Sequence, residues 1–440
     1  MEVFDEVVLG GGWAGLLYSR QSLSRNAAKK PRLGVIEKDR EDELGGLLKS
    51  KVIDGFTFDT GGPHILFSKD KQVLSDIVSM LNENSVMRKR NNFVLYHNKL
   101  INYPFENGIY ALEPKVRVRF IRGIIEQMIS LAKNDKWTPS NFLDWIKGFF
   151  GDEIANEYLI PYNEKLWKRS LDKMAADWVF TPGRLPFPKL DEMINSAAGI
   201  PNVGYNEQSF FYYPKRGGIQ ALYNSLLNVV KNLGGKLIVN EKVFEVERKR
   251  NKIYEINDAI KTNKLINTLP LPEILRCIGD SAETKRLSDK FDWNRVAIVG
   301  LALSRKTPDQ TAVYVPDPTV IFHRYTWMSS LIPPTKKDKS NLIAEITIPK
   351  NDNPDLHRIV DKTIKGLADL EVISDEEQVI FSKAWLNEYG YPIYAIDHNE
   401  TRNLAMTLLN EFGIKSVGRW GSWHYWNTDM VFNAVLRLND

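Results

Sequence analysis

Three glycines near the N-terminus have the spacing that allows a chain to bind the pyrophosphate of a dinucleotide. Gly10, Gly12 and Gly15 follow an apolar run at 7–9 and precede a stretch that can form a helix. In this motif the first glycine permits a tight turn, the second allows close approach of the phosphates, and the third allows the helix to pack on the strand. The helix N-terminus adds unpaired N–H groups and the positive end of its dipole. The sequence therefore predicts a bound dinucleotide.

The second apolar run of the chain ends in Glu37. A carboxylate at the tip of the second strand can accept a hydrogen bond from a ribose hydroxyl. Two more glycine pairs follow, Gly45-Gly46 and Gly61-Gly62. An NAD domain needs only the first glycine motif, whereas a backbone that approaches the cofactor repeatedly favours a longer ligand. We therefore predict FAD.

Elements that could position these residues follow from apolar periodicity. Helical spacing predicts helices over 71–81, 116–132 and 140–158. Apolar runs predict strands over 236–239 and 243–246.

The later part of the chain has a different pattern. Strand runs at 296–299, 311–315 and 342–347 are separated by proline-containing turns, which predicts an antiparallel sheet. Residues 417–438 contain a glycine turn and then an apolar helix.

Together these patterns predict an α/β fold with three parts. We expect a discontinuous Rossmann-like FAD-binding domain made of 1–102, 206–290 and 405–440. A helical substrate-binding insertion would occupy 103–205, and an antiparallel β-sheet substrate domain would occupy 291–404.

Composition excludes several functional classes. A net charge of +4 over 440 residues is too small to indicate nucleic acid as a partner. The short basic runs at 88–90 and 248–250 are typical of solvated faces. The single cysteine, Cys277, excludes an internal disulfide and a thiolate metal cage, and the histidines lack metal-ligand spacing, so we predict no metal.

The N-terminus enters the first strand almost at once, which leaves no room for a signal peptide. No apolar run reaches the roughly 18 to 20 residues needed to cross a bilayer. We therefore expect a cytoplasmic protein without a transmembrane segment.

Several segments resemble the UDP-galactopyranose mutase family. They are Phe-Asp-Thr-Gly-Gly-Pro-His-Ile-Leu-Phe at 58–67, Tyr-Pro-Phe-Glu-Asn at 103–107, Pro-Tyr-Asn-Glu-Lys-Leu-Trp at 161–167, and Gly-Arg-Trp-Gly-Ser-Trp-His-Tyr-Trp-Asn at 418–427. They run in order along the whole chain. The Gly10 motif and the Thr-Leu-Pro at 268–270 also resemble protoporphyrinogen oxidases and amine oxidases.

The resemblance implies a flavin-dependent isomerase. Such an enzyme converts UDP-galactopyranose to UDP-galactofuranose through an adduct at N5 of reduced FAD, with no net oxidation. It would need a nucleotide-sugar substrate and an external reductant for the flavin, and it could form a homo-oligomer.

The diphosphate leaving group demands cations, and arginine suits it through its planar, bidentate guanidinium. The resemblance assigns this role to Arg184 and Arg324. It places the hydroxyl groups of Tyr391 and Tyr425 near the same oxygens, and Tyr314 on the substrate side.

The resemblance assigns further contacts with the substrate. Tyr103 and Trp167 would stack on or line the uridine pocket. Asn163 would bind the sugar or a phosphate, and Asn427 is placed among the substrate-binding residues.

Three contacts with the cofactor follow in the same way. His64 would lie near flavin N5 and tune the reduced ring. Arg419 would face the FAD pyrophosphate or ring, and the backbone of Val243 would contact adenine.

Two other functions remain open at this stage. One is an FAD-dependent oxidase or dehydrogenase of the amine oxidase or protoporphyrinogen oxidase group. The other is a catalytically silent, flavin-bearing binding subunit. A mutase needs Arg184 and Arg324 pointing into one cavity over the flavin, whereas an amine oxidase has no use for two cations there.

Overall fold

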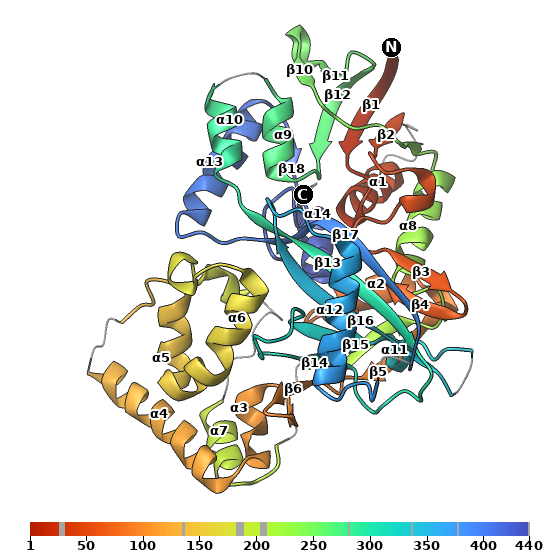
Figure 1. Ribbon diagram of the computed structural model, residues 1–440. Coiled ribbons are helices and arrows are strands. Elements are labelled where there is room, and N and C mark those ends of the chain that lie inside the picture. The colour runs from red at the N-terminus through yellow and green to blue at the C-terminus, as the bar shows by residue number, and fades with distance from the viewer. Residues whose placement is uncertain are drawn as a thin grey trace.

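The computed structural model describes residues 1–25, 31–133, 137–181, 189–202, 209–279, 282–335, 338–375 and 378–438. Figure 1 shows one sheet at the top of the view, a second sheet at the centre and a separate group of helices at the lower left. Across the described ranges, every helix is too short or too polar to cross a bilayer.

The first sheet contains the glycine motif. Its strands are β1 (Glu2–Leu9), β2 (Leu33–Ile36), β9 (Lys236–Ile238), β10 (Val246–Arg248), β11 (Tyr254–Ile256), β12 (Ile260–Asn267) and β18 (Lys415–Ser416). Strands β9, β2, β1, β12 and β18 are parallel neighbours, and β10 and β11 add an antiparallel hairpin to β12. The carboxyl ends of β1 and β2 therefore meet at one edge, which is where nucleotides bind in open parallel sheets.

The strand predicted over 243–246 is wrong in its bounds, because β10 begins only at Val246. The side-chain oxygen of Asn257 accepts hydrogen bonds from the N–H groups of Phe244 and Glu245, at 3.0 and 3.2 Å. A loop amide thus satisfies the donors that a neighbouring strand would otherwise bind.

The second sheet forms the other wall of the molecule. Its strands are β6 (Phe93–Tyr96), β7 (Lys99–Asn102), β13 (Trp293–Leu303), β14 (Ala312–Tyr314), β15 (Arg324–Trp327), β16 (Ser340–Pro349) and β17 (Val379–Pro392). They follow the order β17-β13-β16-β15-β14-β6-β7, and all neighbours are antiparallel except β14 and β6.

One predicted domain boundary needs correction. Residues 93–102, which we assigned to the FAD-binding domain, form β6 and β7 and belong to the second sheet. Val94 pairs with Tyr314, and both Val94 and Ile101 are fully buried. These apolar side chains are covered only when the hairpin joins this sheet. The rest of the three-part division remains a prediction.

Two short two-stranded sheets lie outside the two main sheets. One pairs β3 (Ser50–Ile53) with β4 (Phe56–Asp59), and the other pairs β5 (Ser85–Lys89) with β8 (Phe210–Pro214). The glycine pair Gly61-Gly62 directly follows β4.

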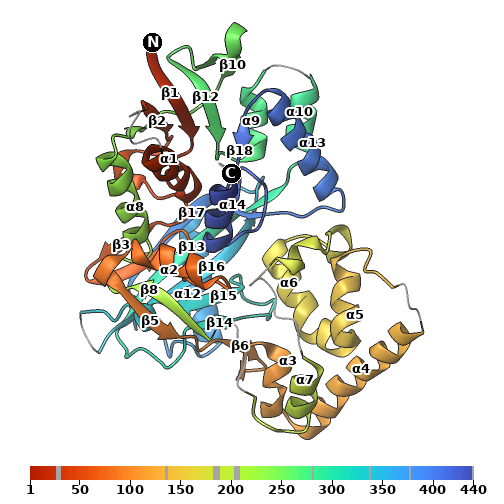
Figure 2. The same ribbon diagram turned by 180° about the vertical axis from the view of Figure 1, so that it is seen from behind.

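Helices cover both sheets. They are α1 (Trp13–Arg25), α2 (Lys71–Ser79), α8 (Gln220–Asn232), α9 (Leu271–Cys277), α10 (Ala282–Asp289), α11 (Met328–Leu331), α12 (Leu356–Asp369), α13 (His398–Glu411) and α14 (Thr428–Leu438). Figures 1 and 2 show α1 and α8 on one side of the first sheet, with α9, α10 and α13 on the other. Helix α12 packs on the second sheet.

The predicted helical insertion contains α3 (Phe105–Gly108), α4 (Pro114–Ala132), α5 (Phe142–Ile154), α6 (Ile160–Trp167) and α7 (Leu190–Ala197). The helix expected over 140–158 is interrupted at Gly151, which has a φ of 72°, and is followed by a π-helical turn at Ala155–Leu159. A Cβ at Gly151 would lie 2.6 Å from the backbone of Gly123 in α4. Glycine therefore allows α4 and α5 to pack closely.

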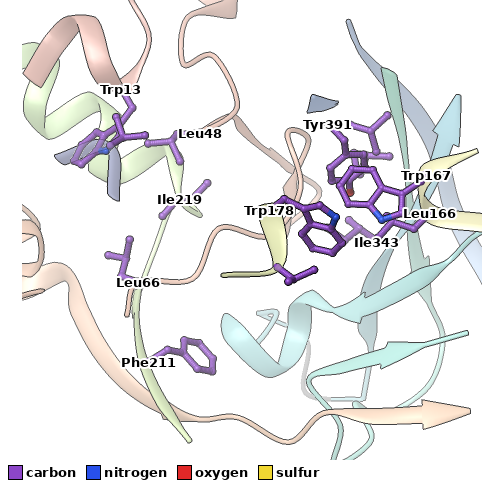
Figure 3. Packing of buried hydrophobic residues seen from close by; sticks show 14 of the residues in the cluster. Trp13, Leu48, Leu66, Leu166, Trp167, Trp178, Phe211, Ile219, Ile343 and Tyr391 are labelled. Carbon is purple, nitrogen blue, oxygen red and sulfur yellow. The ribbon is translucent and has the colours of Figure 1, made fainter. Parts of the chain in front are cut away.

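The largest apolar core runs between the first sheet and the helical part. Figure 3 shows some of its residues in two groups, with Trp13 and Leu48 in one and Leu166, Trp167 and Tyr391 in the other. The functional cavities lie where these parts meet.

Candidate functional site

Two adjoining cavities lie side by side, one between the first sheet and β17 of the second sheet, the other between the second sheet and the helical part. We call the one beside the nucleotide motif the glycine-lined cavity, of about 400 Å³, and its neighbour the tyrosine-lined cavity, of about 210 Å³. The two share one wall, which is formed by Leu47, His64, Arg419, Asn427 and Thr428. Ligands in the two cavities would therefore contact some of the same residues.

The glycine motif forms one side of the glycine-lined cavity. Gly10 has a φ of 96°, and a Cβ at Gly15 would lie 2.0 Å from the carbonyl oxygen of Gly10. These two residues make the turn and the close helix contact possible. A Cβ at Gly12 would meet nothing within 4 Å, so the backbone there borders open space that a phosphate group could occupy.

Glu37 lies on the wall of the same cavity. Its carboxylate accepts hydrogen bonds from the backbone N–H groups of Gly11 and Asp39, at 2.8 and 3.0 Å. These bonds hold the carboxylate next to the glycine turn, where it could accept a hydrogen bond from a ribose hydroxyl.

The later glycine pairs also lie close to the cavities. Gly45 and Gly46 have φ angles of 137° and 58°, and Gly46 lines the glycine-lined cavity. A Cβ at Gly61 would lie 2.1 Å from the carbonyl oxygen of Leu47, and Gly62 has a φ of 96°. Gly61 and Gly62 line the tyrosine-lined cavity.

A buried acid anchors the Gly61-Gly62 turn. The carboxylate of Asp59 accepts hydrogen bonds from the hydroxyls of Tyr213 and Ser50, at 2.5 and 2.7 Å, and from the N–H of Ile219 at 3.3 Å. Burial raises the pKa of Asp59 to about 6, although these donors oppose the shift. Asp59 thereby ties β4 to β8 and to the start of α8.

Arg419 places a positive charge on the shared wall. Its guanidinium donates hydrogen bonds to the carbonyls of Trp426 and Gly390, at 3.3 and 2.6 Å, and lies 4.6 Å from the ring centre of Tyr425. Burial lowers its pKa. Within the described ranges the Nε of Arg419 has no hydrogen-bond partner. An anionic ligand would supply the missing partner.

These features fit a dinucleotide such as FAD. The open backbone at Gly12, the carboxylate of Glu37 and the half-buried cation of Arg419 line the same cavity. The side-chain nitrogen of Asn427, also on the shared wall, lacks a hydrogen-bond partner in the part of the chain that the structure describes.

Arg324 and Glu345 form an ion pair in the tyrosine-lined cavity. They are direct neighbours across β15 and β16. Nε and Nη2 of Arg324 donate to the two carboxylate oxygens at 2.6 and 2.7 Å. Glu345 is 2% exposed. Burial acts to lower the pKa of Arg324, but the charge and hydrogen bonds of Glu345 raise it above its ordinary value.

Several tyrosines line the same cavity. Tyr103 and Tyr314 stack with ring centres 4.6 Å apart, and Tyr162 meets Tyr314 edge-on at 5.7 Å. The hydroxyl of Tyr391 donates to Glu345 at 3.2 Å, and Tyr425 packs edge-on against Tyr391 at 5.6 Å. Burial raises the pKa of Tyr103, Tyr162 and Tyr391, so their hydroxyls remain protonated donors.

Of two further residues expected to bind substrate, one lines the tyrosine-lined cavity and the other lies behind its wall. Asn163 lines the cavity and donates a hydrogen bond to the carbonyl of Leu159 at 2.8 Å. Trp167 is fully buried and packs behind the wall, against Trp178, Tyr391 and Tyr425 (Figure 3). Trp178, rather than Trp167, lines the cavity itself.

Arg184 lies outside the described residues. Val243 is buried beside α9, where its carbonyl accepts a hydrogen bond from the thiol of Cys277 at 3.5 Å, and it is absent from the described lining of both cavities. His64 lies on the shared wall. The roles expected for these three residues remain predictions.

The interpretation of the sequence missed two charged residues of the site. Glu345 interrupts an apolar strand pattern, and a buried acid requires a partner, so the pattern contained a usable signal. Arg90 belongs to a basic run that we interpreted as a solvated face, yet it lines the tyrosine-lined cavity beside Phe67, 5.7 Å from its ring centre. Its local sequence gives no sign of this position.

Comparison with known proteins supports the fold. A family model described as an NAD(P)-binding Rossmann-like domain matches residues 8–81. A solved structure of reduced UDP-galactopyranose mutase has a TM-score of 0.86 at 22% identity, over 100% of this chain and 94% of that one.

Two further solved structures are similar along their whole length. A provisionally named protoporphyrinogen oxidase from an Exiguobacterium species has a TM-score of 0.72 at 15% identity, over 100% of this chain and 98% of that one. Cyclohexylamine oxidase from Brevibacterium oxydans has a TM-score of 0.65 at 11% identity, over 99% and 98%. The predicted α/β fold, with its Rossmann-like domain and antiparallel sheet, is confirmed.

Proposed function

We propose that this chain is an FAD-dependent isomerase that contracts the pyranose ring of a nucleotide sugar, with UDP-galactopyranose as substrate and UDP-galactofuranose as product. The observation that carries the proposal is Arg324, which lies in a cavity that shares a wall with the glycine-lined cavity. A guanidinium at that position suits a departing diphosphate. The similarity to a mutase structure is consistent with this choice.

FAD would occupy the glycine-lined cavity. Its pyrophosphate would lie against Gly10 and Gly12, and a ribose hydroxyl against Glu37. When bound and reduced, FAD would supply a nucleophilic nitrogen for chemistry at the anomeric carbon. The chain needs an external reductant for this state.

The nucleotide sugar would occupy the tyrosine-lined cavity. Glu345 takes the Nε and Nη2 donors of Arg324, which leaves the Nη1 N–H groups for phosphate oxygens. The ion pair fixes the plane of the guanidinium before the substrate arrives. The hydroxyl of Tyr391 also donates a hydrogen bond to Glu345 and helps to hold it in place. Tyr103 and Tyr314 have aromatic faces on which a base could stack.

Arg419 lies on the shared wall and would contact both ligands. It would balance negative charge on the cofactor side, while Asn427 could donate a hydrogen bond to either ligand. Arg184 is proposed as the second cation that binds the diphosphate leaving group.

The decisive experiment uses purified protein, reduced with dithionite in the absence of oxygen. UDP-galactofuranose is added and the formation of UDP-galactopyranose is followed by chromatography. We expect conversion only with reduced flavin, and loss of conversion in Arg324→Ala but not in Arg358→Ala, which removes an exposed arginine on α12. Equal conversion by wild type and Arg324→Ala would refute the role of Arg324.

A second candidate is an amine oxidase. The buried carboxylate of Glu345 and the surrounding tyrosines could also surround a cationic amine, and the structural neighbours include amine oxidases. Oxygen consumption with primary amines, together with no sugar conversion, would favour this function over the mutase.

A further inference from the structure

Helix α4 exposes an apolar stripe on the surface of the helical part. Val118, Ile125, Met128 and Ile129 are 51%, 45%, 43% and 54% exposed. Their spacing places them along one side of the helix, because residues seven, three or four positions apart lie on a common face. The opposite side of α4 is buried through Phe120 and Ile124, so packing of the helix in the fold does not require the exposed stripe.

A basic ridge borders this stripe. Lys115, Arg122 and Lys133 are exposed, and their spacing of seven and eleven residues places them on one line along the helix. None of the three forms an ion pair with a described residue. Glu126 is the acidic residue within the ridge, so its net charge is positive.

The neighbouring helix α7 also exposes apolar side chains. The chain just after α7 contacts the beginning of α4, since a Cβ at Gly199 would lie 2.1 Å from the guanidinium of Arg117. Leu190 and Ile194 on α7 are 39% and 46% exposed. Figures 1 and 2 show α4 at the outer edge of the molecule, away from both sheets.

We propose that this surface, Val118, Ile125, Met128 and Ile129 with the ridge of Lys115, Arg122 and Lys133, binds an anionic lipid bilayer peripherally. An apolar stripe flanked by lysine and arginine is the pattern of a helix that lies in the plane of a membrane interface. The stripe would enter the headgroup region while the unpaired cations meet lipid phosphates.

Charge argues against a second copy of the chain as the occupant. A two-fold contact through the middle of α4 would place Arg122 against its own copy and set one basic ridge beside another. An anionic bilayer instead offers complementary charge along the whole ridge. This inference is independent of the proposed catalytic function.

The test is flotation of the full-length, FAD-loaded protein with vesicles. We expect binding to phosphatidylcholine vesicles that contain phosphatidylserine, no binding to phosphatidylcholine alone, and weaker binding in high salt. Lys115→Gln with Arg122→Gln should weaken partitioning about 25-fold, at about fivefold for each charge removed. Ile125→Ser with Ile129→Ser should abolish it.

Control variants alter equally exposed residues elsewhere. Arg358→Gln on α12 and Leu404→Ser on α13, where Leu404 is 50% exposed, should bind like wild type. Flavin absorbance and thermal unfolding verify that each variant is folded. Absence of binding to anionic vesicles would overturn the proposal, as would unchanged binding of the α4 variants. A dimer that Ile125→Ser with Ile129→Ser dissociates, without vesicle binding, would assign the surface to a second copy.

Discussion

At the scale of single residues, the site depends on a charge that is partly neutralised before any ligand binds. Arg324 is held by Glu345 rather than left open to the cavity. The ion pair orients the guanidinium and lowers the free energy of burying it. The proposed diphosphate ligand would therefore bind to a guanidinium whose charge is already partly neutralised, which favours a dianionic ligand over a weakly charged one.

Removing Arg324 should destabilise the protein, because the buried carboxylate of Glu345 would lose its partner. We expect Arg324→Ala to lower the free energy of unfolding by about 3–5 kcal/mol, measured by urea denaturation. The double variant Arg324→Ala with Glu345→Gln should regain part of this loss. A double variant as unstable as the single one would contradict the explanation.

Asp59 should make stability depend on pH. Its pKa is about 6 in the folded protein and about 3.9 in an unfolded chain, so the folded state binds the proton more tightly. Its contribution is fully present below about pH 4 and is lost as the pH rises through 6.

The comparison variant is Asp59→Asn, which cannot titrate. The free energy of unfolding of wild type minus that of the variant should fall by about 2–3 kcal/mol between pH 4 and pH 7. Denaturant unfolding at a series of pH values measures it. A difference that rises with pH would mean that Tyr213 and Ser50 lower the pKa instead.

At the scale of elements, glycines serve two separable purposes. Gly61 allows the turn after β4 to lie against Leu47, where a Cβ would lie 2.1 Å from a carbonyl oxygen. Gly12 meets nothing within 4 Å, so its lack of a side chain matters to a ligand and not to the fold.

This distinction predicts opposite behaviour for two alanine substitutions. Gly12→Ala should unfold at the same temperature as wild type without cofactor, but should bind FAD more weakly. Gly61→Ala should lose about 1–3 kcal/mol of stability even without cofactor. Calorimetry and FAD titration separate the effects, and equal FAD affinity of Gly12→Ala and wild type would place the pyrophosphate elsewhere.

At the scale of the whole molecule, the tyrosine-lined cavity exists only while the helical part stays against the second sheet. Lys165 on α6 connects them: its buried ammonium donates hydrogen bonds to the carbonyls of Val315 and Asp317, at 3.1 and 2.5 Å. Burial lowers the pKa of Lys165 to about 7. The same helix carries Tyr162 and Asn163 on the cavity wall.

Replacing Lys165 should loosen this junction. Lys165→Met keeps the apolar stem but leaves the buried carbonyl of Val315 and the half-buried carbonyl of Asp317 without this donor, so we expect a loss of about 1.5–3 kcal/mol in urea unfolding. UDP affinity should fall while FAD affinity stays constant, because the glycine-lined cavity lies on the far side of the shared wall. Parallel loss of both affinities would show that the two cavities depend on one packing unit.

The sequence by itself determined the features that depend on neighbouring residues. The spacing of Gly10, Gly12 and Gly15 specifies a turn between a strand and a helix, because a side chain at these positions would obstruct the turn, the phosphates or the packing of the helix. Apolar periodicity likewise predicted α4 and β16 to within a few residues. Boundaries failed where a distant side chain intervened, as Asn257 did before β10.

Only the tertiary structure decided which charges meet. Arg324 and Glu345 are twenty-one residues apart, and their contact follows from the register of β15 on β16. Trp167, which the resemblance places at the uridine pocket, lies behind the cavity wall, and Arg90, which we interpreted as part of a solvated face, lines the cavity. Such placements arise because burial and ion pairing are set by segments that come together from distant parts of the chain, and local spacing carries no information about that assembly.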